Sequence, residues 1–161
     1  MIRSILAGAA ALGIVLAAAA GVATAQTRPA PSSQPIMVGA DSGEQTPAGF
    51  ALRGRAEVLQ GDNRLRADAI QGVSTGGAIS QVTASGNVYY VTPTETIRGD
   101  RAVYTVSDTT IVVTGDVILT QGRNVLTGGR LVYNIDTGSA RMEGASGTRI
   151  QGVFYPQGSR D

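Results

Sequence analysis

The stretch TGDVILTQGRNVLTGGRLVY, Thr114–Tyr133, decides the fold of this chain. Its first half alternates apolar and polar residues, so that Val117 and Leu119 fall on one face of an extended chain and Asp116 on the other. Such alternation is typical of an antiparallel strand that is covered on one side only. A Gln-Gly turn follows, and the alternation then resumes. The stretch therefore predicts two antiparallel strands with one common apolar face.

The same pattern occurs a second time in SGNVYYVTPTETIRGDRAVY, Ser85–Tyr104. The two copies begin at Gly86 and Gly115, which are 29 residues apart. An earlier copy begins at Gly54 and a truncated copy begins at Gly144. A period of this length indicates supersecondary units that stack on one another.

The second half of each copy changes phase by one residue. Leu126 and Gly128 share a face, whereas the next apolar set contains Leu131 and Tyr133. A glycine at such a shift predicts a bulge or a corner in the strand. Each repeat is therefore interpreted as a strand, a turn and a kinked strand. One bent hairpin cannot bury its apolar face alone, so we expect the repeats to stack into a continuous interior, as in a solenoid or a rolled sandwich.

The first 25 residues are predicted to be a secretory signal peptide. Arg3 supplies a positive charge, Ile5–Ala20 is an uncharged apolar run, and small residues end at Ala25, where cleavage is expected. A retained membrane anchor is the alternative. The run is rich in Ala and Gly, however, and a spanning helix needs about 20 strongly apolar residues.

The remaining chain divides by composition. Residues 26–49 are rich in Pro, Ser, Gly and Gln and are expected to be a flexible leader. An edge strand at Pro35–Gly39 is an open alternative. The β-domain is expected over residues 50–156, with a C-terminal tail at residues 157–161.

The composition excludes several kinds of chemistry. The chain has no His and no Cys, which removes Ser-His-Asp and Cys-His catalysis and the usual zinc sites. We expect no cofactor, no metal and no enzymatic activity. Without Arg3, the 13 basic residues fall to 12, which face 12 acidic residues. A neutral chain offers no general attraction for nucleic acid, and none is expected as a partner.

Acidic residues at the repeat corners are the remaining candidates for hydrolysis. Asp68, Asp100 and Asp116 lie close to glycines and recur with the repeat. Short polar side chains at such places usually hold turns. The interpretation as turn residues is therefore favoured over a hydrolase with paired acids.

The repeats resemble those of the LptA/OstA-like family of periplasmic lipopolysaccharide-transport proteins. The similarity is carried by TGDVILTQ (Thr114–Gln121), IRGDRAVY (Ile97–Tyr104), LRADAI (Leu65–Ile70) and RIQGVFYP (Arg149–Pro156). The third copy departs from the pattern, since Gly129 stands where the family has Asp.

The resemblance implies an all-β fold, a slightly twisted, V-shaped β-jelly roll of antiparallel strands. It also implies a periplasmic protein that shelters the acyl chains of lipid A. It further implies head-to-tail contacts with other copies through edge strands, and contacts with an LptC-like inner-membrane partner and an LptD-like outer-membrane partner. The residues expected to line the lipid groove are Leu52, Ala56, Val58, Val88, Tyr90, Ile97, Tyr104, Val113, Val117, Leu119, Leu126 and Tyr133.

Three alternatives remain open from the sequence. The same residues could form a sealed core in place of a groove. The chain could be a structural β-repeat adaptor that joins membrane complexes by strand addition without carrying lipid. It could also be the periplasmic domain of an LptC-like relative.

Overall fold

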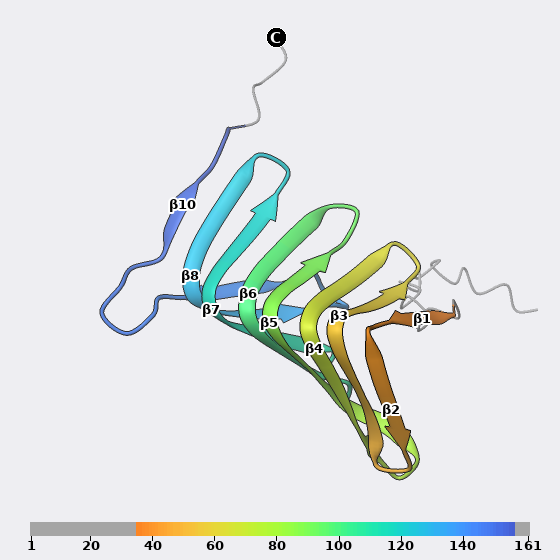
Figure 1. The fold of residues 1–161 in the computed structure, drawn as a ribbon. Coiled ribbons are helices and arrows are strands. Elements are labelled where there is room, and N and C mark those ends of the chain that lie inside the picture. Colours follow the sequence, from red (N-terminus) through yellow and green to blue (C-terminus); the bar gives the residue numbers. More distant parts are fainter. Residues whose placement is uncertain (1–34, 157–161) are drawn as a thin grey trace, which may run out of the picture.

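A computed structural model describes residues 35–156 of the chain, and these residues form one antiparallel sheet (Figure 1). The predicted signal peptide, residues 26–34 of the predicted leader and the tail at residues 157–161 lie outside the described part. The ten strands are β1 Ile36–Gly39, β2 Ser42–Thr46, β3 Gly49–Gln60, β4 Asn63–Thr75, β5 Ala78–Val91, β6 Glu95–Thr105, β7 Thr110–Gln121, β8 Asn124–Asn134, β9 Ala140–Glu143 and β10 Gln151–Val153.

The long strands β3 to β8 form a meander in which each strand pairs with the next in the chain. At one edge, β1 and β2 both pair with β3, and at the other edge β9 and β10 both pair with β8. The expectation of an all-β, repeat-built antiparallel fold is confirmed. Between residues 35 and 156 there is no helix that is long and apolar enough to cross a membrane.

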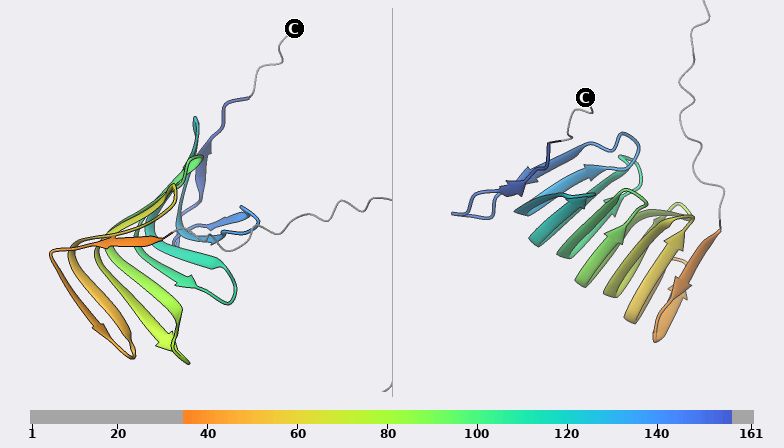
Figure 2. Two further views of the ribbon diagram at one scale, coloured as in Figure 1. Left: turned by 90° about the vertical axis from the view of Figure 1, so that its right-hand side faces the viewer. Right: turned by 90° about the horizontal axis from the view of Figure 1, so that it is seen from above.

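The sheet bends sharply along a line through the middle of its long strands, which gives it the shape of a V (Figures 1 and 2). We call the half that contains β1 and β10 the first arm and the half that contains β2 and β9 the second arm. The bend coincides with a register shift in every pairing between long strands, for example between Thr114 and Val117 where β7 pairs with β8. The inner face of the V is the apolar face that the repeats predict.

Two successive left-handed residues make the bend in every second strand. In β7 these are Gly115 and Asp116, with φ angles of 78° and 38°. The neighbouring strand β8 offers one residue, Gly129, against this pair, which is the arrangement of a β-bulge. The sequence places the bend in the second strand of each repeat only. The structure bends the first strand as well, because the two-residue bulge turns the chain while keeping apolar residues inward.

The sheet begins at Ile36, within the segment expected to be a flexible leader. The open alternative of an edge strand at Pro35–Gly39 corresponds to β1. Val38 pairs with Val58, and Leu65 pairs with the same residue from the other side. Val38–Asp41 is therefore an incomplete earlier copy of Leu65–Asp68. The residues after this copy are mostly polar, so the repeat pattern is difficult to recognise there in the sequence.

The opposite edge is an incomplete copy too. Met142 in β9 pairs with Leu131 in the same register that Val113 has in β7. By this register Gly144 corresponds to Gly115, in agreement with the predicted truncated copy. The chain leaves the sheet there, and β10 resumes pairing with β8 in the first arm.

Candidate functional site: the inner face of the bent sheet

The inner face carries apolar rows that run along the whole sheet, across the strands. In the first arm, the pairs Leu65–Tyr90, Tyr90–Ile97 and Ile97–Leu119 are direct neighbours, and the row continues to Leu126. A parallel row in the second arm consists of Leu52, Ile70, Ala84, Ala102, Val113 and Leu131. The strand pleat produces these rows, because every second side chain points to the same face.

The structure brings all twelve predicted lining residues together on this face. Nine of them belong to the buried cluster, and Val58, Tyr104 and Leu126 pack against it half-buried. The expected lipid contacts themselves remain a prediction. The lining also contains buried residues outside the predicted set, namely Ala67, Ile70, Ala84, Ala102, Ile111 and Leu131. Ile70, Ala102 and Leu131 follow the phase change within each repeat, whereas Ala67, Ala84 and Ile111 belong to the regular alternation before it.

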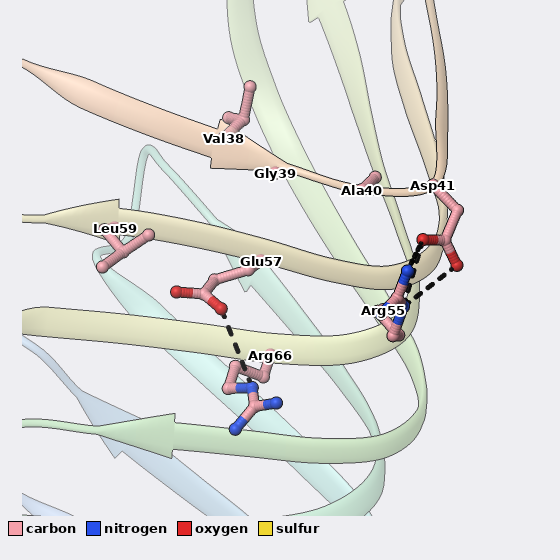
Figure 3. Close-up of a pocket in the computed structure, with 8 residues that line it drawn as sticks. All are labelled: Val38, Gly39, Ala40, Asp41, Arg55, Glu57, Leu59 and Arg66. Carbon is pink, nitrogen blue, oxygen red and sulfur yellow. Dashed lines mark hydrogen bonds and ion pairs between the residues drawn. The ribbon is translucent and has the colours of Figure 1, made fainter.

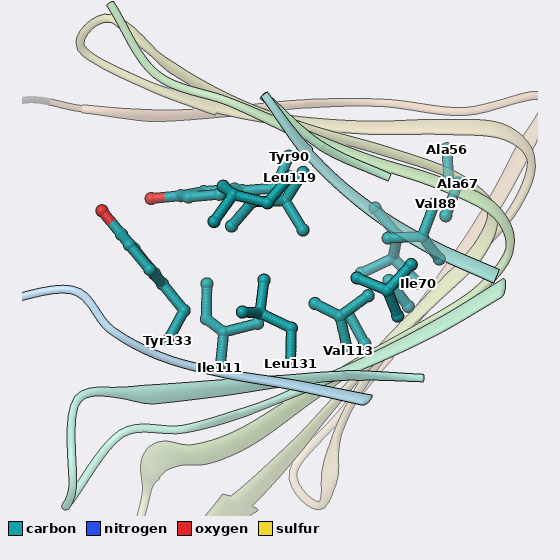
Figure 4. Packing of buried hydrophobic residues seen from close by; sticks show 14 of the residues in the cluster. Ala56, Ala67, Ile70, Val88, Tyr90, Ile111, Val113, Leu119, Leu131 and Tyr133 are labelled. Atoms are coloured by element: carbon teal, nitrogen blue, oxygen red, sulfur yellow. The ribbon is translucent and has the colours of Figure 1, made fainter. Parts of the chain in front are cut away.

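The arms contact each other near the bend. Val113 in the second arm fills the position that a side chain on Gly99 would need in the first arm. Figure 4 shows Ile111, Val113, Leu131 and Tyr133 on one layer, facing Tyr90 and Leu119 on the other. Val113 and Leu131 have no exposed surface. The deep part of the V is therefore dry and close-packed.

Space on the inner face is found at the end near β10. A cavity of about 30 Å³ is lined by Leu119, Gln121, Asn124, Val125, Leu126 and Phe154. This is room for a few water molecules and not for an acyl chain. An acyl chain does not fit this cavity in the conformation described, and the described backbone pairing joins the arms only along the bend.

The rim of the first arm changes from apolar to polar. Glu95 lies two residues before the buried Ile97 and so points to the same inner face. It is paired directly with Gln121, whose Nε2 donates a hydrogen bond of 2.7 Å to Glu95 Oε1. The other oxygen, Oε2, is buried, and no described donor makes a hydrogen bond of normal distance and angle to it.

Tyrosine side chains face this rim from both arms. The rings of Tyr90 and Tyr133 lie 6.5 Å apart at an angle of 56°, and their hydroxyl ends point away from the bend (Figure 4). Burial raises the pKa of Tyr133 to about 12, and hydrogen bonding to Glu95 and the charge of that carboxylate add to the rise. Burial also raises the pKa of Tyr90 and of Tyr104. At the mouth of the V, partial burial therefore favours the protonated form of these tyrosine hydroxyl groups.

Both edges of the sheet expose apolar side chains. In β1, Ile36, Met37 and Val38 are each about 60% exposed. At the other edge, Val153 in β10 is 56% exposed and the following residue, Phe154, is 65% exposed. Each edge strand pairs on one side only in the described part, so backbone groups on the other side are open to pairing.

An open hollow of about 470 Å³ lies on the outer side of the first arm, near β1 (Figure 3). Its charges are paired: Arg55 binds Asp41 with an Nε–Oδ1 distance of 3.0 Å, and Arg66 lies 3.8 Å from Glu57. The hydrogen bond from Arg55 lowers the pKa of Asp41. The charged groups that line this hollow therefore form ion pairs with one another.

The corner aspartates act in the fold. Asp68 and Asp100 lie over the glycines Gly86 and Gly115, and Asp68 accepts a hydrogen bond of 3.0 Å from Asn87 Nδ2. Among residues 35–156, no three acidic side chains gather closely enough to hold a metal ion. These positions favour the interpretation as corner residues over that of a hydrolytic site.

Comparison with known proteins places this geometry in context. A model of the family described as "LptA/(LptD N-terminal domain) LPS transport protein" matches residues 40–139. An uncharacterized protein of Rhizobium meliloti (strain 1021) is 30% identical over 165 residues, which cover 92% of this chain and 88% of that protein. The crystal structure of LptH from Pseudomonas aeruginosa, described as "the LptA homologous periplasmic component of the conserved lipopolysaccharide transport device", has a similar fold. Its TM-score is 0.70 at 24% identity, over 78% of this chain and 98% of that one.

Proposed function

Because the chain belongs to the LptA/LptD N-terminal domain family of lipopolysaccharide transport proteins, we propose that it is a periplasmic bridge component that holds the acyl chains of lipopolysaccharide between its two arms. One observation carries this proposal: the inner face is apolar along its whole length and ends at two edges that can accept further strands. Burial of each methylene group of an acyl chain contributes about 0.8 kcal/mol. A chain held between the arms would therefore be bound without any covalent step.

The proposed location is the periplasm, after removal of residues 1–25. The similar fold of the periplasmic component LptH supports this location. We also propose residues 50–156 as the lipid-binding unit, with β1 and β2 completing its first edge. The twelve residues named in the sequence remain the proposed lining.

Self-association through the edges supports the bridge. The exposed apolar side chains of β1 at one end and of β10 at the other are positioned for strand addition between copies. The same edges are the proposed contacts for an LptC-like partner at the inner membrane and an LptD-like partner at the outer membrane. Continuous strand pairing would align the inner faces of successive copies.

A photo-crosslinking amino acid tests the lipid contact. Placed at Leu119, which points inward, it should form an adduct with lipopolysaccharide in cells. Placed at Ile118, the next residue on the outer face of the same strand, it should form none. Absence of an adduct from Leu119 and also from Val117 would contradict the lipid-carrying function.

A structural adaptor without lipid is the second candidate, and the close packing between the arms favours it. In that case, inward positions give no lipid adduct, while disruption of the edge strands still abolishes function. Crosslinking at Leu119 together with an edge variant therefore separates the two candidates.

A further inference from the structure

The carboxylate of Glu95 is held in a fixed position at the mouth of the V. Thr92 Oγ1 accepts a hydrogen bond of 3.1 Å from the backbone N–H of Glu95. The backbone N–H of Thr92 donates a hydrogen bond of 2.9 Å to the carbonyl oxygen of Glu95. Gln121 binds Oε1 at 2.7 Å. Backbone and one carboxylate oxygen are thus both fixed by short contacts.

The second oxygen of this carboxylate has no such partner. Oε2 is buried, and no described donor makes a hydrogen bond of normal distance and angle to it, although the Tyr133 side chain lies close enough to interact with this carboxylate. A buried acceptor without a donor costs about 1–3 kcal/mol, and more when it is charged. This cost falls at a position on the inner face, next to the pair Ile97–Leu119, where an apolar residue would extend the apolar face toward the rim.

The surroundings restrict what could bind there. Tyr90 lies on the same arm as Glu95, and Tyr133 reaches over from the other arm. The charge of Glu95 contributes to the raised pKa of Tyr90, and both hydrogen bonding to Glu95 and its charge contribute to the raised pKa of Tyr133, so the carboxylate lies near both side chains. A neutral donor could approach Oε2, whereas a phosphate would meet like charge.

We propose that Glu95, supported by Gln121, Tyr90 and Tyr133, is a recognition point for a neutral hydrogen-bond donor, a hydroxyl or an amide N–H, on the polar end of a bound acyl chain. This inference rests on the proposed lipid binding and specifies its chemistry. The apolar rows take the alkyl tail, Oε2 accepts the donor at the rim, and anionic groups are kept away from the mouth.

The test compares two probes with the same tail, 1-dodecanol below its solubility limit and monododecyl phosphate below its critical micelle concentration. Binding to the exported chain is measured by displacement of an apolar fluorescent dye. Glu95→Gln keeps the size of the side chain and removes the charge. We expect dodecanol binding to weaken several-fold, up to about ten-fold, since hydrogen bonds to charged groups are the stronger ones. Dodecyl phosphate binding should become tighter in the same variant.

The expected changes in the binding of the two probes have opposite directions, and this distinguishes recognition by Glu95 from a general structural effect of the substitution. Glu44 is an exposed residue on the outer face of β2, so Glu44→Gln is the matched control. This variant should leave the binding of both probes unchanged. Tyr133→Phe should weaken dodecanol less than Glu95→Gln does, because it leaves Oε2 in place. Two results would contradict the recognition point while leaving the proposed lipid binding intact. In the first, Glu95→Gln weakens the binding of both probes. In the second, the wild type binds both probes and Glu95→Gln changes the binding of neither. If the wild type binds neither probe and gives no adduct from Leu119, the proposed function fails as well.

Discussion

The carboxylate of Asp100 lies where a β-carbon on Gly115 would have to be. Asp68 has the same relationship to Gly86, and Asp41 has it to Gly54. Each glycine is in the left-handed region, with φ between 75° and 78°. The bend of the sheet is therefore built from one repeated contact between an aspartate and the glycine of a neighbouring strand. At the last corner Gly129 replaces the aspartate, and Ala145 fills the space.

The Gly115→Ala variant is expected to lose stability for two reasons. A non-glycine residue in a sparsely populated backbone region costs about 1–3 kcal/mol, and the new methyl group also collides with Asp100. Gly76→Ala is the control, since its φ is 63° but nothing lies within 4 Å of the added carbon. Unfolding in urea should show the larger loss for Gly115→Ala. Addition of Asp100→Ala should recover the difference, and a purely additive double mutant would contradict the contact.

Alkaline pH is expected to destabilise the protein through Tyr133. Its pKa is about 12 in the folded state and about 10 in an unfolded chain, so the folded state favours the protonated form. This contribution is fully present below pH 10 and is lost as the pH rises toward 12. Tyrosinate absorbance should show a step near pH 12 that Tyr133→Phe removes. A titration in which that step persists in Tyr133→Phe would contradict the assignment.

Acidic pH is expected to weaken the corner between β1 and β3. The hydrogen bond from Arg55 lowers the pKa of Asp41, so the carboxylate contributes stability above its unfolded pKa of about 4. This contribution disappears as the pH falls below 4 and through the lowered folded value. Both groups are exposed, so the effect should be small and sensitive to salt. Asp41→Asn should lower the urea midpoint at pH 7 but no longer at pH 2. Asp62→Asn, in an exposed hairpin, serves as the control.

Self-association through β1 is expected to depend on one backbone amide. Asp41 N–H bonds Gly54 O, and the alternation of a strand then directs the N–H groups of Gly39 and Met37 toward β3. The N–H of Val38 points to the open edge. Val38→Pro removes this donor while the sheet inside remains paired.

Light scattering over a concentration series should show the Val38→Pro variant as smaller species than the wild type. Val38→Thr keeps the amide and should associate like the wild type. Unfolding in urea must give similar midpoints for both variants. Equal association of Val38→Pro and the wild type would show that β1 is not the contact between copies.

Several features of the molecule follow from the sequence alone. The alternation around Gly86 and Gly115 predicts the strands, and the phase change after Gly128 predicts the bend. The parity of apolar residues also assigns all twelve lining residues to one face. These features are local, because the pleat of a strand fixes which side chains share a face and a glycine at a phase change marks where the chain can turn.

Other features exist only in the folded sheet. Val38–Asp41 completes the first edge because β3 offers a strand with free backbone groups, and the short apolar run before it left an edge strand only as an open alternative. Glu95 meets Tyr133 because the bend brings strands of opposite arms together across the mouth. The angle of the bend and the packing of Val113 against Gly99 decide how closely the arms approach. Periodicity along a chain places a side chain on a face, but only packing between distant strands decides what it faces.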